Sequence, residues 1–243
     1  MVAPSLRVDG ADAKRVFRAG AAVIDITPTN FPVIVNAMFE ERSATKAVDT
    51  LHSRSLALDD GQERLVITVV DTCMMPRDLL DEAKALAAKA TGIPPDRMLI
   101  SATHTHSAPS AMGCLGSRVD ANYAAFLPGR IAEGIERAVK NLAPARDGWG
   151  VIDDSEHTHN RRWIRRPDRL LSDPFGDKNV RANMHTGHLN PDAIGPSGPV
   201  DPGLSLLSVQ TSDGKPVALL ANYSMHYYES PQLSADYYGV FAT

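Results

Sequence analysis

The sequence has little cysteine, few aromatic residues and no long hydrophobic run. Of its 243 residues only two are cysteine, Cys73 and Cys114, and 6% are aromatic. Two cysteines are too few for a disulfide-stabilised scaffold; we expect free buried thiols, with a single bridge as the alternative. No run approaches the ~18 consecutive apolar residues of a membrane-spanning helix. The chain is therefore expected to fold around an ordinary hydrophobic core.

The sequence has no surplus of positive charge either: it contains 25 lysines and arginines and 29 acidic residues, and its net charge is −4. This balance argues against nucleic acid or an anionic membrane as the partner. The first twenty residues contain no apolar signal core, and residues 1–14 are expected to form a flexible arm. The GxSxG, Walker and GxGxxG motifs are absent as well, so serine-hydrolase, nucleotide-binding and Rossmann functions lose their main support.

What the sequence does contain is an alternation of strand and helix patterns. The apolar strand at 64–72, the helix at 76–92 and the strand at 97–103 form a β-α-β unit, which predicts two parallel neighbouring strands. Gly92 is expected to cap the helix, and strand 64–72 to be buried on both faces. The fold class predicted is α/β, a mixed β-sheet core with flanking helices. Further strands are predicted at 17–28, 52–61 and 148–157, a hairpin at 203–226 around Asp213-Gly214, and a second helix at 121–142.

Two helix details and one long segment complete this prediction. Pro128-Gly129 should break or kink the second helix, whose inward residues are expected to be Ile131, Ile135, Ala138, Val139 and Leu142. The inward stripe of the first helix is expected to be Leu79, Leu80, Ala83, Leu86, Ala87 and Ala90. Residues 158–202 show little periodicity and are too long for an idle loop, so they should be functional or stabilised by something else.

Histidines mark the ends of two predicted strands. His104 and His106 follow the strand at 97–103, and His226 ends the strand that begins at 216. Ligand sites gather at the carboxyl ends of strands, and neutral imidazole is a common zinc ligand. In an extended segment both side chains of the HxH pair point the same way, so both could bind one metal, or one could bind it while the other moves protons. The small residues that follow would let a metal or substrate approach the backbone.

Other polar residues carry weaker predictions. Asp71 and Asp25 could orient a histidine ligand or cap a turn. The arginines of 157–166 could clamp an anion or a carbonyl, but a solvated basic turn is favoured. His185 and His188 are expected on a surface loop, and His52 receives no role.

These motifs together resemble a known family. ISATHTHSAPSA (100–111) resembles the THTHSGPGG signature of neutral/alkaline, non-lysosomal ceramidases. AAVIDITP (21–28), HNRRW (159–163), the stretch from GPVDP to ANYSMH (198–226) and LSADYYG (233–239) are similar to further segments of that family, in the same order. The sequence looks most like its divergent bacterial members.

The resemblance implies zinc-dependent hydrolysis of a linear, ceramide-like N-acyl amide. It implies His104 and His226 as Zn²⁺ ligands and His106 as general base or acid, with Arg161 and Asn160 holding substrate or oxyanion and Ser107 in the substrate site. It also implies a secreted or periplasmic protein. The family's remaining ligands, a glutamate and a tyrosine, come from later in the chain. We therefore expect 15–243 to be the N-terminal part of a larger catalytic domain, truncated at its C-terminal end.

Two alternatives remain open. An amidohydrolase-type (β/α) barrel also carries HxH at a strand end, but on its first strand, whereas several strands precede His104 here. A non-catalytic binding module or an incomplete fragment of the ceramidase family is the other. The sequence does not identify the acyl amide or the oligomeric state.

Overall fold

The computed structural model describes residues 15–184, 186–187, 189–227 and 230–243. The predicted arm at 1–14 lies outside this part, as do His185 and His188. The chain divides into two compact units. The first comprises residues 1–148, 208–219 and 227–243, and the second comprises 149–207 and 220–226.

A seven-stranded mixed sheet has the strand order β14-β13-β7-β1-β4-β5-β6. β1, β4 and β5 are joined by antiparallel pairing, whereas β5 and β6 are parallel. The parallel pair is the one that the β-α-β pattern predicted, and the α/β class with a mixed sheet is confirmed. The strands are β1 (Arg18–Asp25), β4 (His52–Asp59), β5 (Arg64–Val70), β6 (Met98–Ala102), β7 (Ala143–Asp153), β13 (Gly203–Thr211) and β14 (Pro216–Asn222).

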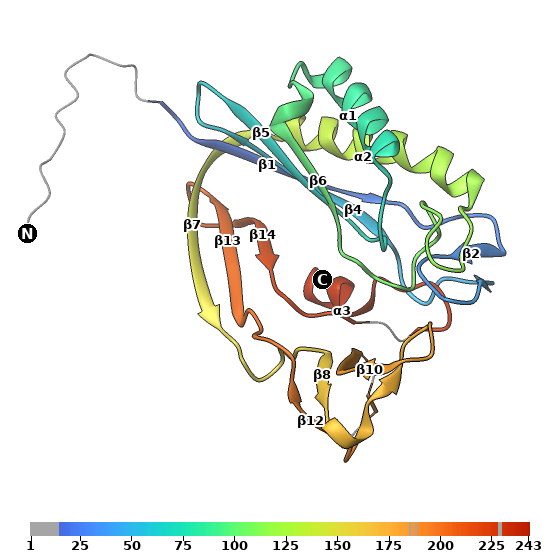
Figure 1. Ribbon diagram of the computed structural model, residues 1–243. Helices are drawn as coiled ribbons and strands as arrows, with labels where there is room; N and C mark the ends of the chain where they lie inside the picture. The colour runs from blue at the N-terminus through green and yellow to red at the C-terminus, as the bar shows by residue number, and fades with distance from the viewer. Residues whose placement is uncertain (1–14, 185, 188, 228–229) are drawn as a thin grey trace, which may run out of the picture. The chain divides into compact units, whose positions relative to one another are not determined.

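Two helices, α1 (Arg77–Thr91) and α2 (Ala121–Lys140), lie side by side over the strands of the first unit (Figure 1). Gly92 caps α1 as predicted: its φ is 72°, and its N–H donates to the carbonyl of Ala88. Of the predicted α1 stripe, however, Leu86 is 42% exposed and Ala90 is also exposed. The buried stripe is narrower than predicted, because α1 packs on the core mostly through small side chains. The buried residues of α1 are Leu79, Ala83 and Ala87.

Helix α2 begins at an N-cap, Asp120, whose carboxylate accepts from the N–H of Tyr123. It does not break at Pro128, which lies inside the helix. Proline removes one backbone hydrogen bond, but buried residues on both sides of it, Leu127 and Ile131, hold the helix on the core. The predicted inward residues are confirmed, since Ile131, Ile135 and Ala138 are fully buried and Val139 and Leu142 pack against the core.

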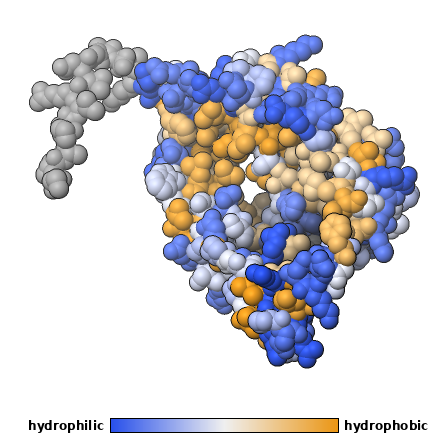
Figure 2. Space-filling model, viewed as in Figure 1, coloured by the Kyte–Doolittle hydropathy of each residue, from blue (hydrophilic) through white to orange (hydrophobic). Residues whose placement is uncertain are grey.

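Strand β5 is buried on one face rather than both. Val66, Thr68 and Val70 are buried beneath the helices, while Leu65 is 43% exposed and Ile67 and Val69 are half-buried. The apolar composition suggested a doubly covered strand, but only one face is covered in the described part of the chain. Figure 2 shows hydrophobic residues spread over part of the visible surface, and none of the described helices is long and apolar enough to cross a membrane.

The hairpin of β13 and β14 forms as predicted, with Gly214 at φ 91° in its turn. Its second strand ends at Asn222 rather than at His226. Strand β7 begins five residues earlier than predicted, because it continues directly from the end of α2. Two short strands, β2 (Val33–Val35) and β3 (Arg42–Ala44), were not predicted at all. They pair with each other beside the loop that carries His104 and His106, which we call the histidine loop.

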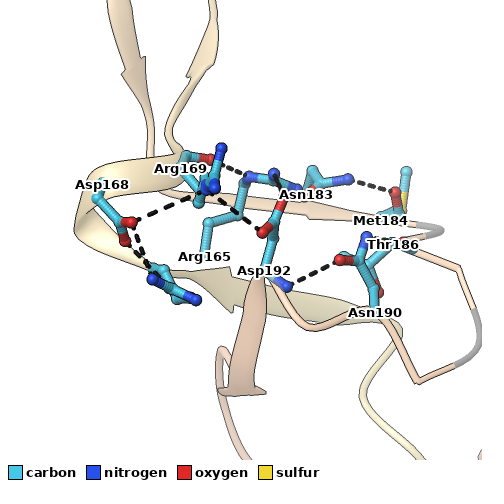
Figure 3. Close-up of polar contacts among 9 residues, drawn as sticks. Arg165, Asp168, Arg169, Asn183, Met184, Thr186, Asn190 and Asp192 are labelled. Carbon is cyan, nitrogen blue, oxygen red and sulfur yellow. Dashed lines mark hydrogen bonds and ion pairs between the residues drawn. The ribbon is translucent and has the colours of Figure 1, made fainter.

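The aperiodic segment 158–202 belongs to the second unit and is held by short strands of its own. Strands β11 (Ala182–Met184), β8 (Arg162–Arg165) and β12 (Ala193–Pro196) form one small sheet, and β9 (Leu171–Ser172) pairs with β10 (Lys178–Val180). The buried Arg165 crosslinks it by donating to the Arg169 carbonyl at 2.6 Å, Asn183 at 3.3 Å and Asp192 at 3.2 Å (Figure 3). A buried arginine with several acceptors thus stabilises a segment that has no hydrophobic periodicity.

Candidate functional site

The histidine pair lies just beyond the carboxyl end of β6, in the first unit. His104 has φ 71°, a left-handed conformation that is uncommon for a residue with a side chain. Its N–H donates to the carbonyl of Thr72, at the end of the neighbouring strand β5. The prediction of an extended HxH segment is therefore wrong: β6 ends at Ala102, and the chain turns at His104. The two imidazole rings nevertheless lie next to each other.

The two rings present the same kind of nitrogen to each other. The Nε2 atoms of His104 and His106 lie 3.2 Å apart, and the rings are nearly perpendicular, with centroids 4.8 Å apart. Two nitrogen ligands of one tetrahedral zinc, at ~2.05 Å each, are separated by roughly 3.3 Å. The pair therefore already has the spacing of two ligands of one ion. It also has the spacing of a hydrogen bond from one Nε2–H to the other Nε2.

The opposite nitrogen of His104 is held by the backbone. Nδ1 lies 2.9 Å from the carbonyl oxygen of Cys73, and since a carbonyl only accepts, Nδ1 carries the proton. In the neutral ring, Nε2 of His104 is therefore the nitrogen that carries the lone pair. Metal-bound histidines commonly donate their other N–H to a carbonyl or carboxylate in this way. The local structure thus fits His104 as a ligand through Nε2.

Cys73 lies next to this pair but on the other side of the His104 ring. Its Sγ is 3.7 Å from Nδ1 of His104, whereas His106 faces Nε2. Cys73, His104 and His106 form a group whose potential ligand atoms lie within 4.8 Å of one another. Since each residue offers one ligand atom to this group, the three side chains could hold one metal ion. Burial, and then the charge of Cys114, raises the pKa of the Cys73 thiol to about 12. Both cysteines are free, as expected, but only Cys73 is buried, and Cys114 is half-buried.

The residues after the histidines pack against another part of the chain. Ala108 and Ser110 are fully buried, and their backbones hydrogen-bond Asn36 and Ile34. The small side chains therefore permit a close approach by the β2 segment. Ser107 is also fully buried, and its hydroxyl donates to the carbonyl of Ser230 at 3.3 Å.

The other predicted site residues belong to the second unit. His226 and Arg161 are exposed, and Asn160 is half-buried. The amide of Asn160 accepts from the N–H of Arg162 at 2.9 Å and donates to the carbonyl of Pro199 at 3.3 Å. The structure thus brings together His104 and His106, and describes His226, Asn160 and Arg161 separately from them.

The acidic residues near the strand ends have structural partners. Asp71 is fully buried, and one of its oxygens accepts from the N–H of His52 at 2.8 Å and from Arg54 at 2.7 Å. Burial raises the pKa of Asp71, and the Arg54 charge partly offsets this. Asp25 accepts from the N–H of Thr27 at 2.8 Å. The turn-capping interpretation therefore holds for Asp25. Asp71 instead hydrogen-bonds two residues at the start of β4, His52 and Arg54.

Comparison with solved structures identifies the architecture. The neutral ceramidase from Pseudomonas aeruginosa superposes with a TM-score of 0.65 at 22% identity, covering 91% of this chain and 34% of the other. A ceramidase complexed with C2 gives 0.59 at 22% identity, covering 85% and 31%. The fold is ceramidase-like. The chain spans about a third of these proteins, and neither a family model nor a curated protein sequence matches it.

Sequence reasoning missed the residues that support the histidines. The Cys73 carbonyl that fixes His104 is a backbone group, which no motif reveals. Arg42, which donates to the carbonyl of His106 at 3.1 Å, lies 64 residues earlier in an unpredicted strand. Asp236 falls within the SAD stretch that the sequence analysis noted only as a resemblance.

Proposed function

We propose that this chain carries part of the active site of a zinc-dependent hydrolase of linear, ceramide-like N-acyl amides, and that it is a divergent relative of the neutral ceramidases. The observation that supports this most directly is the His104–His106 pair, with its Nε2 atoms 3.2 Å apart and Nδ1 of His104 tied to a carbonyl. The ceramidase-like fold supports the choice of reaction. Residues 15–243 would be one α/β domain of a larger catalytic unit.

The roles assigned to the residues are those that the resemblance to the ceramidase family implies. His104 and His226 would bind Zn²⁺, which, when bound, acidifies a coordinated water and polarises the amide carbonyl. His106 would accept the proton of the attacking water and return it to the leaving nitrogen. The guanidinium of Arg161 would stabilise the developing oxyanion, and Asn160 and Ser107 would bind the substrate.

The tautomers constrain this scheme. With Nδ1–H of His104 donated to the Cys73 carbonyl, Nε2 would be the atom of His104 that binds the ion. His106 would act as a base at Nε2 only in the tautomer that carries its proton on Nδ1, because the accepting nitrogen must hold a lone pair.

A second assignment uses the same atoms. The Nε2 spacing equally suits both histidines as ligands of one ion, in which case the base lies elsewhere. Substitution of His106 by alanine separates the two assignments: a general base is lost with zinc retained and amide hydrolysis abolished, whereas a ligand is lost together with the zinc.

The experiment is elemental analysis of the purified protein, comparing the unmodified chain with His104→Ala, His106→Ala and His226→Ala. Near-stoichiometric zinc that disappears in His104→Ala and His226→Ala supports the proposal, and hydrolysis is then tested on N-acyl amides of increasing chain length. His52→Ala is the matched control, because that ring interacts with Arg54 within β4. Zinc content unchanged in both ligand variants would refute the assignment.

A further inference from the structure

The histidine loop is clamped by the stretch Ser230–Asp236, far along the chain. The N–H of Ser234 donates to the carbonyl of Ser107 at 2.8 Å, and the hydroxyl of Thr105 donates to the carbonyl of Ser234 at 3.0 Å. Thr105 is fully buried and also hydrogen-bonds the carboxyl group of Asp236. The residue between the two histidines is therefore fixed by a segment 131 positions away.

Arg42 joins the two segments from the other side. One amino group donates to the carbonyl of Pro231 at 2.7 Å, and the other lies 3.1 Å from the carbonyls of both Ser230 and His106. The planar guanidinium fork can hold acceptors from two strands of chain at once, which an ammonium group does less rigidly. Arg42 thus sets the separation of the His106 backbone from Ser230–Asp236.

The clamping stretch is itself anchored independently of the histidines. Asp49 accepts from the hydroxyl of Ser234 at 2.5 Å and from the N–H of Ala235 at 2.7 Å. Leu233 is fully buried, and its backbone bonds to Lys46 and Val48. The histidine loop is therefore fastened to a fixed support rather than to a loose end.

Backbone strain is concentrated where the loop and the clamp meet. His104 and Asp236 both have left-handed conformations, with φ of 71° and 51°. Such conformations persist at non-glycine residues only where surrounding interactions enforce them, and they cluster at functional sites. Thr105 is the neighbour of His104 and the partner of Asp236, so one hydrogen bond connects the two strained residues.

We propose that Asp236 and Arg42 are positioning residues of this site, which set the orientation of His106 relative to His104 through the Thr105 hydroxyl and the His106 carbonyl. Neither side chain needs to touch a substrate in this role. The inference rests on the proposed function for its consequence, since a displaced His106 would lie wrongly for proton transfer.

The test removes each contact while preserving the backbone. Asp236→Gly deletes the carboxyl group at a position where glycine accepts positive φ. Asp236→Asn retains a side chain that can hydrogen-bond the Thr105 hydroxyl, and Thr105→Val deletes that hydroxyl at nearly constant volume. Arg42→Lys keeps the charge but not the fork. Arg118→Ala is the control, because Arg118 makes an exposed ion pair with Glu41.

The first readout is the histidine region of long-range ¹H–¹⁵N spectra of the metal-free chain, with signals assigned through His104→Gln and His106→Gln. We expect Asp236→Gly, Thr105→Val and Arg42→Lys to shift both imidazole signals, Asp236→Asn to restore most of the unmodified spectrum, and Arg118→Ala to change nothing. Folded variants with unchanged imidazole signals would overturn the proposal.

The second readout is zinc affinity, measured by competition with a chromophoric chelator. Supporting residues around metal ligands typically change affinity ~10–100-fold, and we expect at least a ~10-fold loss in Asp236→Gly with recovery in Asp236→Asn. If the unmodified chain binds no zinc, the proposed function fails while the spectra still decide the positioning roles. If it binds zinc and these variants bind it equally tightly, the positioning roles fail and the proposed function stands.

Discussion

Gly20 allows α2 to lie directly on β1, and its replacement by alanine should show how tightly that contact is packed. A Cβ at this position would lie 2.3 Å from the carbonyl oxygen of Ala138, 2.6 Å from the carbonyl carbon of Asn141 and 2.7 Å from the nitrogen of Leu142. Ordinary contact begins near 3.4 Å, so the overlap is about 1 Å. All three atoms are backbone, so a rotamer change cannot relieve it.

The expected loss is at the upper end of the range for overpacking. Inserted methyl groups in a packed core cost about 1–3 kcal/mol, and occasionally more. In Gly20→Ala the end of α2 must move away from β1, and this movement also weakens the hydrogen bond from the Asn141 side chain to the carbonyl of Ala21. We therefore expect the substitution to lower the free energy of unfolding by about 3 kcal/mol.

The assay is urea denaturation followed by circular dichroism, with Gly129→Ala as the matched control. Gly129 is an exposed residue inside α2, and a methyl group added there would meet no atom within 4 Å. There the substitution should raise stability by about 0.5–1 kcal/mol, because alanine restricts the unfolded chain and favours helix. A Gly20→Ala protein within about 1 kcal/mol of the unmodified chain would refute the packing of α2 on β1.

Three further predictions concern the site and the second unit. In the native protein a chromogenic disulfide should titrate Cys114 and leave Cys73 protected until unfolding, because burial raises the pKa of Cys73 to about 12; two fast thiols would contradict this. Burial also raises the pKa of Asp236, so the folded chain holds that proton more tightly than the unfolded chain does. The stability of the unmodified chain relative to Asp236→Asn should therefore fall as pH rises above the ordinary aspartate value of ~3.9, and urea midpoints that diverge in the opposite direction would refute it. Arg165→Ala should lower the free energy of unfolding by about 2 kcal/mol. This is less than the loss on breaking a fully buried ion pair, because Asp192 is 32% exposed; an unchanged thermal transition in calorimetry would contradict it.

The parts of the fold that sequence predicted are those with strong local signals. The β5-α1-β6 unit has a clear apolar strand, an amphipathic helix and a capping glycine, and its parallel pairing is typical of two strands joined by a helical crossover. The β13-β14 hairpin has an Asp-Gly turn. By contrast, β2 and β3 are three residues long, and β8 to β12 have no alternation, so long-range pairing decides their structure.

The failed helix predictions have a common physical cause. Pro128 is unfavourable in a helix interior, yet burial of Leu127, Ile131 and Ile135 outweighs one missing hydrogen bond. On α1, Leu86 has the right spacing for the core, yet its side chain stays 42% exposed. Tertiary packing thus kept a helix intact at Pro128, where the local preference is against helix, and left Leu86 exposed, where the local pattern favours burial.

The candidate site divides in the same way between local and distant determinants. The two histidines are one residue apart in the sequence, and the HxH motif alone indicated a candidate metal site. Their geometry, however, depends on the Cys73 carbonyl, on Arg42 and on Asp236, which come from three separate stretches of chain. An HxH motif therefore specifies the chemical groups, whereas the strained turn at His104 requires its distant partners to be present. With the positioning role proposed for Asp236, a change at this one residue would leave the HxH motif intact while removing the hydrogen bond that fixes Thr105 between the two histidines.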